Sequence, residues 1–394
     1  MTRRTEARLL AIIALAAVGI YSMSCKPAWS PEGDKVAYIL GRQKGEQGRY
    51  AVAIYDLKTK QSETIGEQFK SEKEAGLCPF EVFWPKHGHE ILYLSTPADG
   101  DHGNIIVVSA YDLKTKTTKQ VQYDLEKIKT QRSSDETGSQ DSLSYALSPV
   151  LLQHRRWLWL SGDDGCRRVD LTGKKVRQLK QAQVVFGNEE RIFFVAEGSG
   201  DSIIFGRVKT FLGVRETPLF TVSARENETI IPVLAVPKDC VRFACVKSRD
   251  NKQTLALYDK KGACTKEIDL PESLECDDHG VAGAEWNPDG SILWLATKGE
   301  DEAGKEYTGI AEIQIDNGAV RIIKVNEDRR YGDLLPLHLS LSPTGSHLAA
   351  SVMNTEAPES DEYAGLCLVD LTTSDRNVTL LLPPELVTPA PSKT

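Results

Sequence analysis

Few positions in this chain combine the side chains that bind a divalent cation or exchange protons during catalysis. The stretch Cys-Asp-Asp-His-Gly at residues 276–280 places Asp277, Asp278 and His279 side by side. A metal site needs further ligands from elsewhere in the chain. The best additional candidates lie near the expected starts of inner strands, and they are Glu81, Glu285 and His338. We interpret these six residues as candidates for a site at the centre of the fold.

Two clusters of acidic residues form a second group of candidates, for binding a partner. The first cluster is Glu300, Asp301, Glu302 and Glu306, and the second is Glu356, Glu359, Asp361 and Glu362. A basic group, Arg42, Lys44 and Arg49, lies near the other end of the chain. Adjacent acidic and basic sectors steer a partner of matching polarity. The alternative is a solvated face. The clusters lack the D-x-D-x-D-G pattern of a calcium loop.

Catalytic motifs are absent from the sequence. It contains no G-x-S-x-G nucleophile elbow, no H-E-x-x-H zinc motif and no glycine-rich phosphate loop. We therefore predict that the protein is not an enzyme, and we assign no catalytic residue, metal or cofactor. Formal net charge is −8, which argues against a nucleic-acid partner because such proteins need a basic face.

A repeat of about 50 residues must position all of these side chains. One signal is a strand that ends in Asp before a polar turn, at Asp56, Asp112, Asp170, Asp259, Asp316 and Asp370. A second is a proline turn between strands, at Pro31, Pro85, Pro149, Pro237, Pro288 and Pro343. Both signals leave one double gap in the same place, where a unit without the proline fits at residues 184–198. The count is seven units.

Each unit is predicted to contain four antiparallel strands, and this is the period of a β-propeller blade. We predict an all-β, seven-bladed β-propeller of four-stranded blades, with six or eight blades as alternatives. The segments "WSPEGDKVAY", "WNPDGSILWL" and "LSPTGSHLAA" resemble the WD-like repeat of TolB-type propellers, over residues 27–383. That resemblance implies a protein-interaction module. The repeated "YDLKTK" at residues 55–60 and 111–116 is then a strand end and turn.

The connections between second and third strands, and those between blades, are predicted to be long loops on one face of the ring. They are the ranges 41–49, 95–104, 129–142, 298–309 and 354–365. Loops gathered on one face of a rigid scaffold are typical of a recognition surface. Tolerated insertions are the alternative.

The N-terminus is predicted to be a targeting segment. Three arginines precede the apolar run 9–23, as in a secretory signal, although a membrane anchor is an alternative. Cys25 follows at once, and "YSMSC" resembles a bacterial lipoprotein signal, which implies lipid attachment there. We divide the chain into a signal or anchor (1–24), the propeller (25–383) and a Pro-rich disordered tail (384–394).

The seven remaining cysteines lack metal-binding spacing. We favour buried thiols, with one disulfide among Cys240, Cys245, Cys264 and Cys276 as the alternative.

Two classes of function stay open. The first is a non-catalytic scaffold, exported to the periplasmic side of the cell envelope, tethered to its membrane and bound to a protein partner there, or serving only as a spacer. The second is a propeller enzyme or small-ligand binder that uses its central channel.

Overall fold

The computed structural model contains β-strands as its only long regular elements in the part of the chain that it describes. That part is residues 26–44, 47–65, 77–85, 89–97, 105–124, 147–152, 157–162, 165–170, 175–179, 182, 184–187, 191–199, 201–209, 215–250, 252–272, 274–276, 283–300, 304–326, 334–354 and 362–383. Within these ranges no helix has the length and apolar character needed to cross a membrane. The predicted leader, Cys25 and the tail lie outside them.

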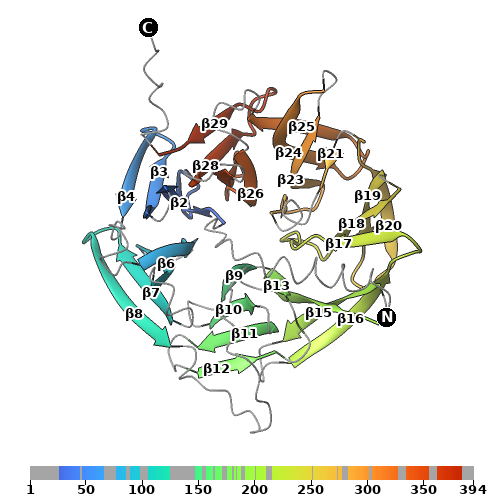
Figure 1. The fold of residues 1–394 in the computed structure, drawn as a ribbon, viewed down its shortest axis with the longest axis horizontal. Coiled ribbons are helices and arrows are strands. Elements are labelled where there is room, and N and C mark those ends of the chain that lie inside the picture. The colour runs from blue at the N-terminus through green and yellow to red at the C-terminus, as the bar shows by residue number, and fades with distance from the viewer. Residues whose placement is uncertain are drawn as a thin grey trace.

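The strands form a ring of antiparallel sheets, and in the four-stranded sheets the strands follow in chain order from the centre to the rim (Figure 1). Four sheets have four strands each. The first contains β5 (Leu77–Phe83), β6 (Glu90–Pro97), β7 (Ile105–Asp112) and β8 (Thr117–Asp124), and the second contains β9 (Leu147–Leu152), β10 (Trp157–Gly162), β11 (Gly165–Asp170) and β12 (Lys175–Gln178). The third contains β13 (Val184–Gly187), β14 (Ile192–Glu197), β15 (Ser202–Lys209) and β16 (Arg215–Ser223), and the fourth contains β17 (Glu228–Pro232), β18 (Phe243–Arg249), β19 (Lys252–Tyr258) and β20 (Cys264–Asp269). The prediction of a β-propeller with four-stranded antiparallel blades is confirmed.

Two further sheets depart from this plan. In one, the short segments β21 (Leu274–Glu275) and β22 (Glu285–Trp286) both pair with β23 (Ile292–Glu300), followed by β24 (Glu306–Gln314) and β25 (Val320–Asn326). The other has eight strands and joins the two ends of the ring. It contains β1 (Ala28–Trp29), β2 (Lys35–Lys44), β3 (Gln47–Asp56) and β4 (Gln61–Ile65), with β26 (Leu334–Leu341), β27 (His347–Asn354), β28 (Glu362–Asp370) and β29 (Val378–Leu381).

The ring closes without exchanging a strand between its first and last blades. Strands β1–β4 and β26–β29 are each consecutive in sequence, and β2 pairs with β28 through Gly41↔Ala364, Arg42↔Tyr363 and Gln43↔Glu362. The indole N–H of Trp29 adds a hydrogen bond to the carbonyl of Ser340, at 2.9 Å. Closure therefore combines main-chain hydrogen bonds and one side-chain bond with an apolar cluster in which Trp29 and Val36 of the first blade pack with Leu366 of the last.

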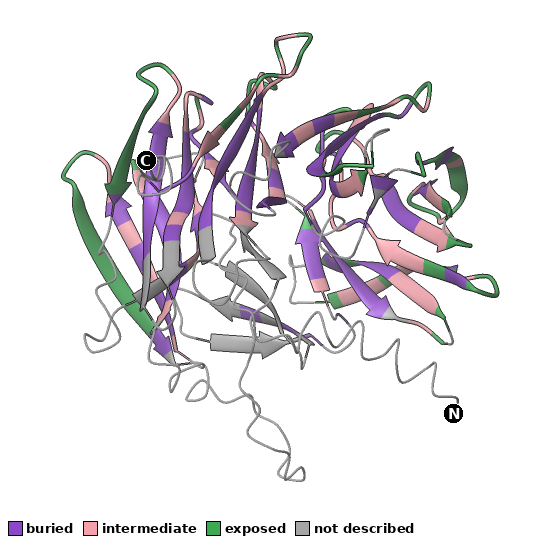
Figure 2. Ribbon diagram, turned by 45° about the horizontal axis from the view of Figure 1, so that its top comes forward, coloured by how far each residue is buried: buried purple, intermediate pink, exposed green. Residues whose placement is uncertain are grey.

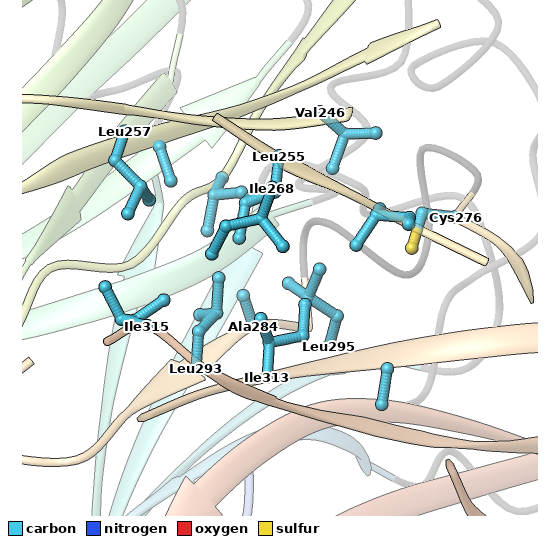
Figure 3. Packing of buried hydrophobic residues seen from close by; sticks show 14 of the residues in the cluster. Val246, Leu255, Leu257, Ile268, Cys276, Ala284, Leu293, Leu295, Ile313 and Ile315 are labelled. Carbon is cyan, nitrogen blue, oxygen red and sulfur yellow. The ribbon is translucent and has the colours of Figure 1, made fainter. Parts of the chain in front are cut away.

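Apolar clusters lie between neighbouring blades and hold the ring together. The largest one contains Leu255 and Leu257 of β19 facing Leu293 and Leu295 of β23, all of them at most 1% exposed (Figure 3). Burying a side chain of this size contributes about 1.5–3 kcal/mol. Exposure rises toward the rim, where β4 and the described part of β8 are mostly exposed (Figure 2).

The repeated hexapeptide adopts the same turn in two successive blades. Asp56 Oδ1 accepts the main-chain N–H groups of Lys58 and Thr59, at 2.8 and 3.0 Å. Asp112 Oδ1 makes the same two bonds with Lys114 and Thr115, at the same distances. These bonds, with the one to Thr59 or Thr115 the largest cause, hold the pKa of each carboxyl below its ordinary value. The turn interpretation of the repeat is confirmed.

The long loops predicted on one face are shorter than expected. Strand β2 continues to Lys44 and β3 begins at Gln47. Most residues of the predicted loop 41–49 are therefore paired strand residues. Likewise the predicted loop 298–309 is partly paired, because Glu300 pairs with Glu306. Main-chain pairing does not depend on side-chain polarity, so polar residues extend these hairpins beyond the core. The predicted loop 129–142 lies outside the described residues.

Six cysteines in the described part of the chain are free, and none forms a disulfide there. The buried ones are Cys166, Cys245, Cys276 and Cys367, whereas Cys240 is half-buried and Cys264 is exposed. Burial raises the pKa of the Cys367 thiol to about 12, so this cysteine is an inert packing group. The disulfide considered among residues 240–276 is absent, since all four candidate cysteines are free.

Candidate functional site

The inner strand of each blade is a sheet edge that faces the centre of the ring, as β9, β13, β17 and β26 show in Figure 1. Four inner strands carry a proline, at Pro79, Pro149, Pro232 and Pro336. Proline is tolerated at an edge because its missing N–H leaves no ladder bond unmade, and it blocks further strand pairing. Side chains from different blades can therefore meet at the inner edge, but another strand cannot pair with it.

β-Bulges occur beside two of the predicted central residues. The pairing of β5 with β6 shifts between Pro79 and Glu81, and the pairing of β26 with β27 shifts between Leu337 and Leu339. His338 is the extra residue in β26 and has a φ of 42°. Bulges redirect side chains and are frequent near functional sites. Both features mark the inner edge as irregular at these positions.

Lys26 connects three blades near the centre of the ring. Its ammonium lies 2.6 Å from Glu285 Oε2 in β22, and its own main chain directly precedes β1. The main-chain N–H of Lys26 also hydrogen-bonds to the carboxylate of Glu81 in β5. The Lys26 side chain is 43% exposed and that of Glu285 is 22% exposed, so water screens this ion pair in part. The structure therefore brings two of the predicted residues, Glu81 and Glu285, to one lysine.

Glu81 is the most perturbed acid in the described part of the chain. It is 4% exposed, and burial raises the pKa of its carboxyl well above the ordinary value. The charge of Lys26 and the main-chain N–H groups of Val82 and Lys26 act in the opposite direction. A buried acid of this kind can hold a proton at a pH where a solvent-exposed glutamate is ionised. Such groups occur at functional sites, although structural networks also produce them.

His338 lies on the same inner edge. A main-chain hydrogen bond made by the next residue fixes the backbone there. The N–H of Leu339 donates to the carbonyl of Gly283, at 3.0 Å, just before β22. A Cβ atom at Gly283 would lie 2.8 Å from the nitrogen of His338, so only glycine fits there. The bulge at His338 therefore accommodates this close contact between neighbouring inner strands.

The remaining predicted residues are distributed as follows. Glu300 and Glu306 are exposed at the paired ends of β23 and β24, and Glu362 begins β28, where its main chain pairs with Gln43. The others lie outside the described residues: Asp277, Asp278 and His279; Asp301 and Glu302; Glu356, Glu359 and Asp361; and Cys25. In the described ranges no group of three or more His, Cys, Asp or Glu side chains is suited to a metal ion.

Lys26 is the residue at this site that the sequence analysis missed. It lies five residues before Pro31, and His338 has the same spacing to Pro343. Glu81 and Glu285 lie four and three residues before their own prolines. Applying that spacing to the first unit would have found Lys26.

A second polar depression lies at one end of the β17–β20 blade. It is lined by Arg225, Glu228, Lys247, Arg249, Asp250, Lys252, Thr254 and Glu267. Lys247 pairs with Glu267 at 3.0 Å, and Glu228 accepts the main-chain N–H of Arg225 at 2.9 Å. Its four cations and three carboxylates largely neutralise each other, so it indicates no particular ligand.

Comparison with known proteins gives the fold and no family. No protein-family model matches the chain, and no curated protein matches its sequence. The structure is similar to an oligogalacturonate lyase from Vibrio parahaemolyticus, with a TM-score of 0.54 and 12% identity over 91% of this chain and 90% of that one. It is also similar to the β-propeller domain of the Trilobed protease from Pyrococcus furiosus, with a TM-score of 0.51 and 11% identity over 91% of this chain and 97% of that one. At such identities the likeness shows the β-propeller fold alone.

Proposed function

We propose that this protein is a seven-bladed propeller of the TolB or WD-like type and acts as a non-catalytic, protein-binding scaffold. In this proposal it is exported to the periplasmic side of a cell envelope and tethered to the membrane through its N-terminal segment, by an anchor or a lipid on Cys25. The observation that carries the proposal is the engagement of Lys26 with Glu285 and Glu81. Among the described residues, the two carboxylates predicted for the centre of the ring, Glu285 and Glu81, both interact with Lys26 of the chain itself.

The proposed partner surface is the face with the β2–β3, β23–β24 and β27–β28 hairpins. Exposed Glu300 and Glu306 lie there, and the main chain of Arg42, from the predicted basic group, pairs with that of Tyr363, next to the acidic Glu362. Opposite charges side by side suit a partner with a complementary pattern. The partner is expected to be a protein of mixed surface charge.

A crosslinking pull-down from intact envelopes tests this function. The full-length protein is compared with a variant in which Glu356, Glu359, Asp361 and Glu362 are changed to Lys. A matched control changes Lys58, Lys114, Lys116 and Lys261 to Glu at exposed turns on the opposite face. We expect one stable protein partner, lost by the first variant and kept by the control. Loss from both variants, or from the control only, would contradict the proposed surface.

A second candidate function is that of a small-ligand binder or enzyme at the centre of the ring. The specific observation in its favour is the buried Glu81 with its raised pKa, and one structural neighbour is named as a lyase. The variant Lys26→Met would free Glu285 for a ligand. Calorimetry with Mn²⁺, Ca²⁺ and Zn²⁺ on the wild type and on this variant checks the idea. Tight, stoichiometric binding that requires Glu81 and Glu285 would favour this function over the scaffold.

A further inference from the structure

We propose that Asn377 is an N-glycosylation site, at which the side-chain amide receives a saccharide from a lipid-linked donor on the exported side of the membrane. The inference rests on the proposed export and adds a covalent modification to it. A three-residue motif and its position at the rim of the ring carry it.

The motif is N-x-S/T, with any residue except proline in the middle. It is the acceptor for N-linked saccharides and is typical of surface segments in exported proteins. It occurs twice in the sequence, at Asn227-Glu228-Thr229 and at Asn377-Val378-Thr379. The motif alone does not choose between the two, but the structure places them in different parts of the propeller.

The Asn377 motif lies where the turn after β28 meets β29, the outermost strand of its blade (Figure 1). Side chains two residues apart in a strand point to the same side, so Asn377 and Thr379 point the same way. Both are exposed, whereas Val378 between them is half-buried. In the described part of the chain β29 pairs only with β28, so its outer edge is open. A transferase can therefore approach the motif from the rim.

Arg376 fixes this turn from the inside. Its guanidinium binds the buried Glu312, with both contacts at 3.1 Å, and also bonds to carbonyls of its own turn. The carbonyl of Asn377 accepts the N–H of Asp370 at 2.9 Å, but the Asn377 side-chain amide has no hydrogen bond to another described residue. The amide is thus available as an acceptor, and a saccharide on it extends into solvent without displacing the buried pair.

The Asn227 motif is less suitable, although Asn227 and Thr229 are exposed as well. Its middle residue, Glu228, is 7% exposed, and Oε2 of Glu228 accepts the main-chain N–H of Arg225 at 2.9 Å. Glu228 also begins β17, which lies on the inner side of its blade (Figure 1). A transferase has to bind all three residues of the motif, so the folded protein offers it Asn377 and not Asn227.

The donor required is a saccharide joined through a diphosphate to a membrane polyprenol. The bond between C1 of the first sugar and the diphosphate oxygen breaks, and Nδ2 of Asn377 forms a bond to C1. The polyprenyl diphosphate leaves with the electron pair of the broken bond, and Nδ2 gives one proton to a base of the transferase. Nothing is oxidised or reduced in this step.

The modification is compatible with the proposed partner surface. Strand β28 runs from the β27–β28 hairpin to Asp370, so the turn that leads to Asn377 lies at the opposite end of the blade from that hairpin. The saccharide therefore leaves the proposed partner surface uncovered.

Mass spectrometry of the full-length protein, isolated from native envelopes and digested, tests the site. We expect the peptide that contains Asn377 to carry a saccharide and the peptide that contains Asn227 to be unmodified. Thr379→Val should abolish the modification because it removes the hydroxyl of the motif, whereas Thr379→Ser retains a hydroxyl and should preserve it. Because Thr379 is exposed, both variants are expected to fold, and circular dichroism checks this.

Cell fractionation separates the two levels of the proposal. Protein found only in the cytoplasm would overturn the export and the modification together. Exported protein with an unmodified Asn377 peptide, or with equal modification in Thr379→Val, would overturn the modification alone. A saccharide on Asn227 and none on Asn377 would overturn the assigned site.

Discussion

Two buried glutamates in this protein have opposite surroundings. Glu312 of β24 is 3% exposed and receives Nε and Nη2 of Arg376, both at 3.1 Å, together with the indole N–H of Trp294 at 3.3 Å. Glu81 of β5 is 4% exposed and receives main-chain N–H groups, while the nearest cation, Lys26, is paired with another carboxylate.

The difference separates a structural carboxylate from a candidate functional one. A bidentate arginine satisfies both oxygens of Glu312 and links the β21–β25 blade to the turn between β28 and β29. At Glu81 burial outweighs the compensating interactions, and the pKa is raised. Two carboxylates that are equally buried therefore need not have the same role. The group that each carboxylate binds determines whether it is structural or a candidate for function.

The largest effect is expected from breaking the structural pair. Glu312→Ala leaves the Arg376 guanidinium, whose side chain is 20% exposed, without its counter-ion between two blades. Removing one member of a buried pair costs about 3–5 kcal/mol. Urea unfolding should show this loss, and Glu300→Ala at an exposed site serves as the control. A loss equal to that of the control would show that the pair does not hold the two blades together.

The next largest effect should depend on pH and come from Glu81. Because its folded pKa is raised, the folded state retains a proton that the unfolded state releases above about pH 4.3, the ordinary value for glutamate. Stability therefore falls as pH rises through this window. Glu81→Gln removes this titration. The free energy of unfolding of the variant should therefore rise relative to that of the wild type as the pH increases from 4 to 8. Parallel pH profiles for the two proteins would contradict the raised pKa.

A smaller effect is expected from Lys26→Met, which removes the positive charge beside Glu81. The ion pair with Glu285 is partly exposed, and such pairs contribute at most about 1 kcal/mol. The same change removes a charge that lowers the pKa of Glu81, so the pH dependence of stability should become steeper. Denaturation at pH 5 and pH 8 checks both statements. An unchanged pH dependence would show that Lys26 does not act on Glu81.

The smallest effect should come from an exposed pair that also bridges two blades. Lys116 lies 2.6 Å from Glu63, with side-chain exposures of 64% and 59%. Solvent screens such a pair, and it contributes little to folding. Lys116→Ala should leave the thermal midpoint unchanged within error, with Glu63→Ala as the matched variant. A decrease comparable to that of Glu312→Ala would mean that burial is not what distinguishes these pairs.

The sequence by itself determined the repeat, the strands and the turns of this protein. Asp56 and Asp112 recur one unit apart and accept the same two N–H groups, because an Asx turn is a local structure that needs only neighbouring residues. Apolar runs bounded by proline and glycine turns, in a repeat of about 50 residues, likewise predicted four antiparallel strands in each blade.

Only the tertiary structure decided how the two ends of the ring meet and which residues share its centre. Pairing of Gly41–Gln43 with Glu362–Ala364 uses main-chain groups, so no side-chain pattern announces it. Lys26 and Glu285 are 259 residues apart, and the curvature of the whole ring brings them to 2.6 Å. Interactions of that kind depend on the sum of all blade-to-blade packing angles, whereas turns and strands depend on neighbours in the chain.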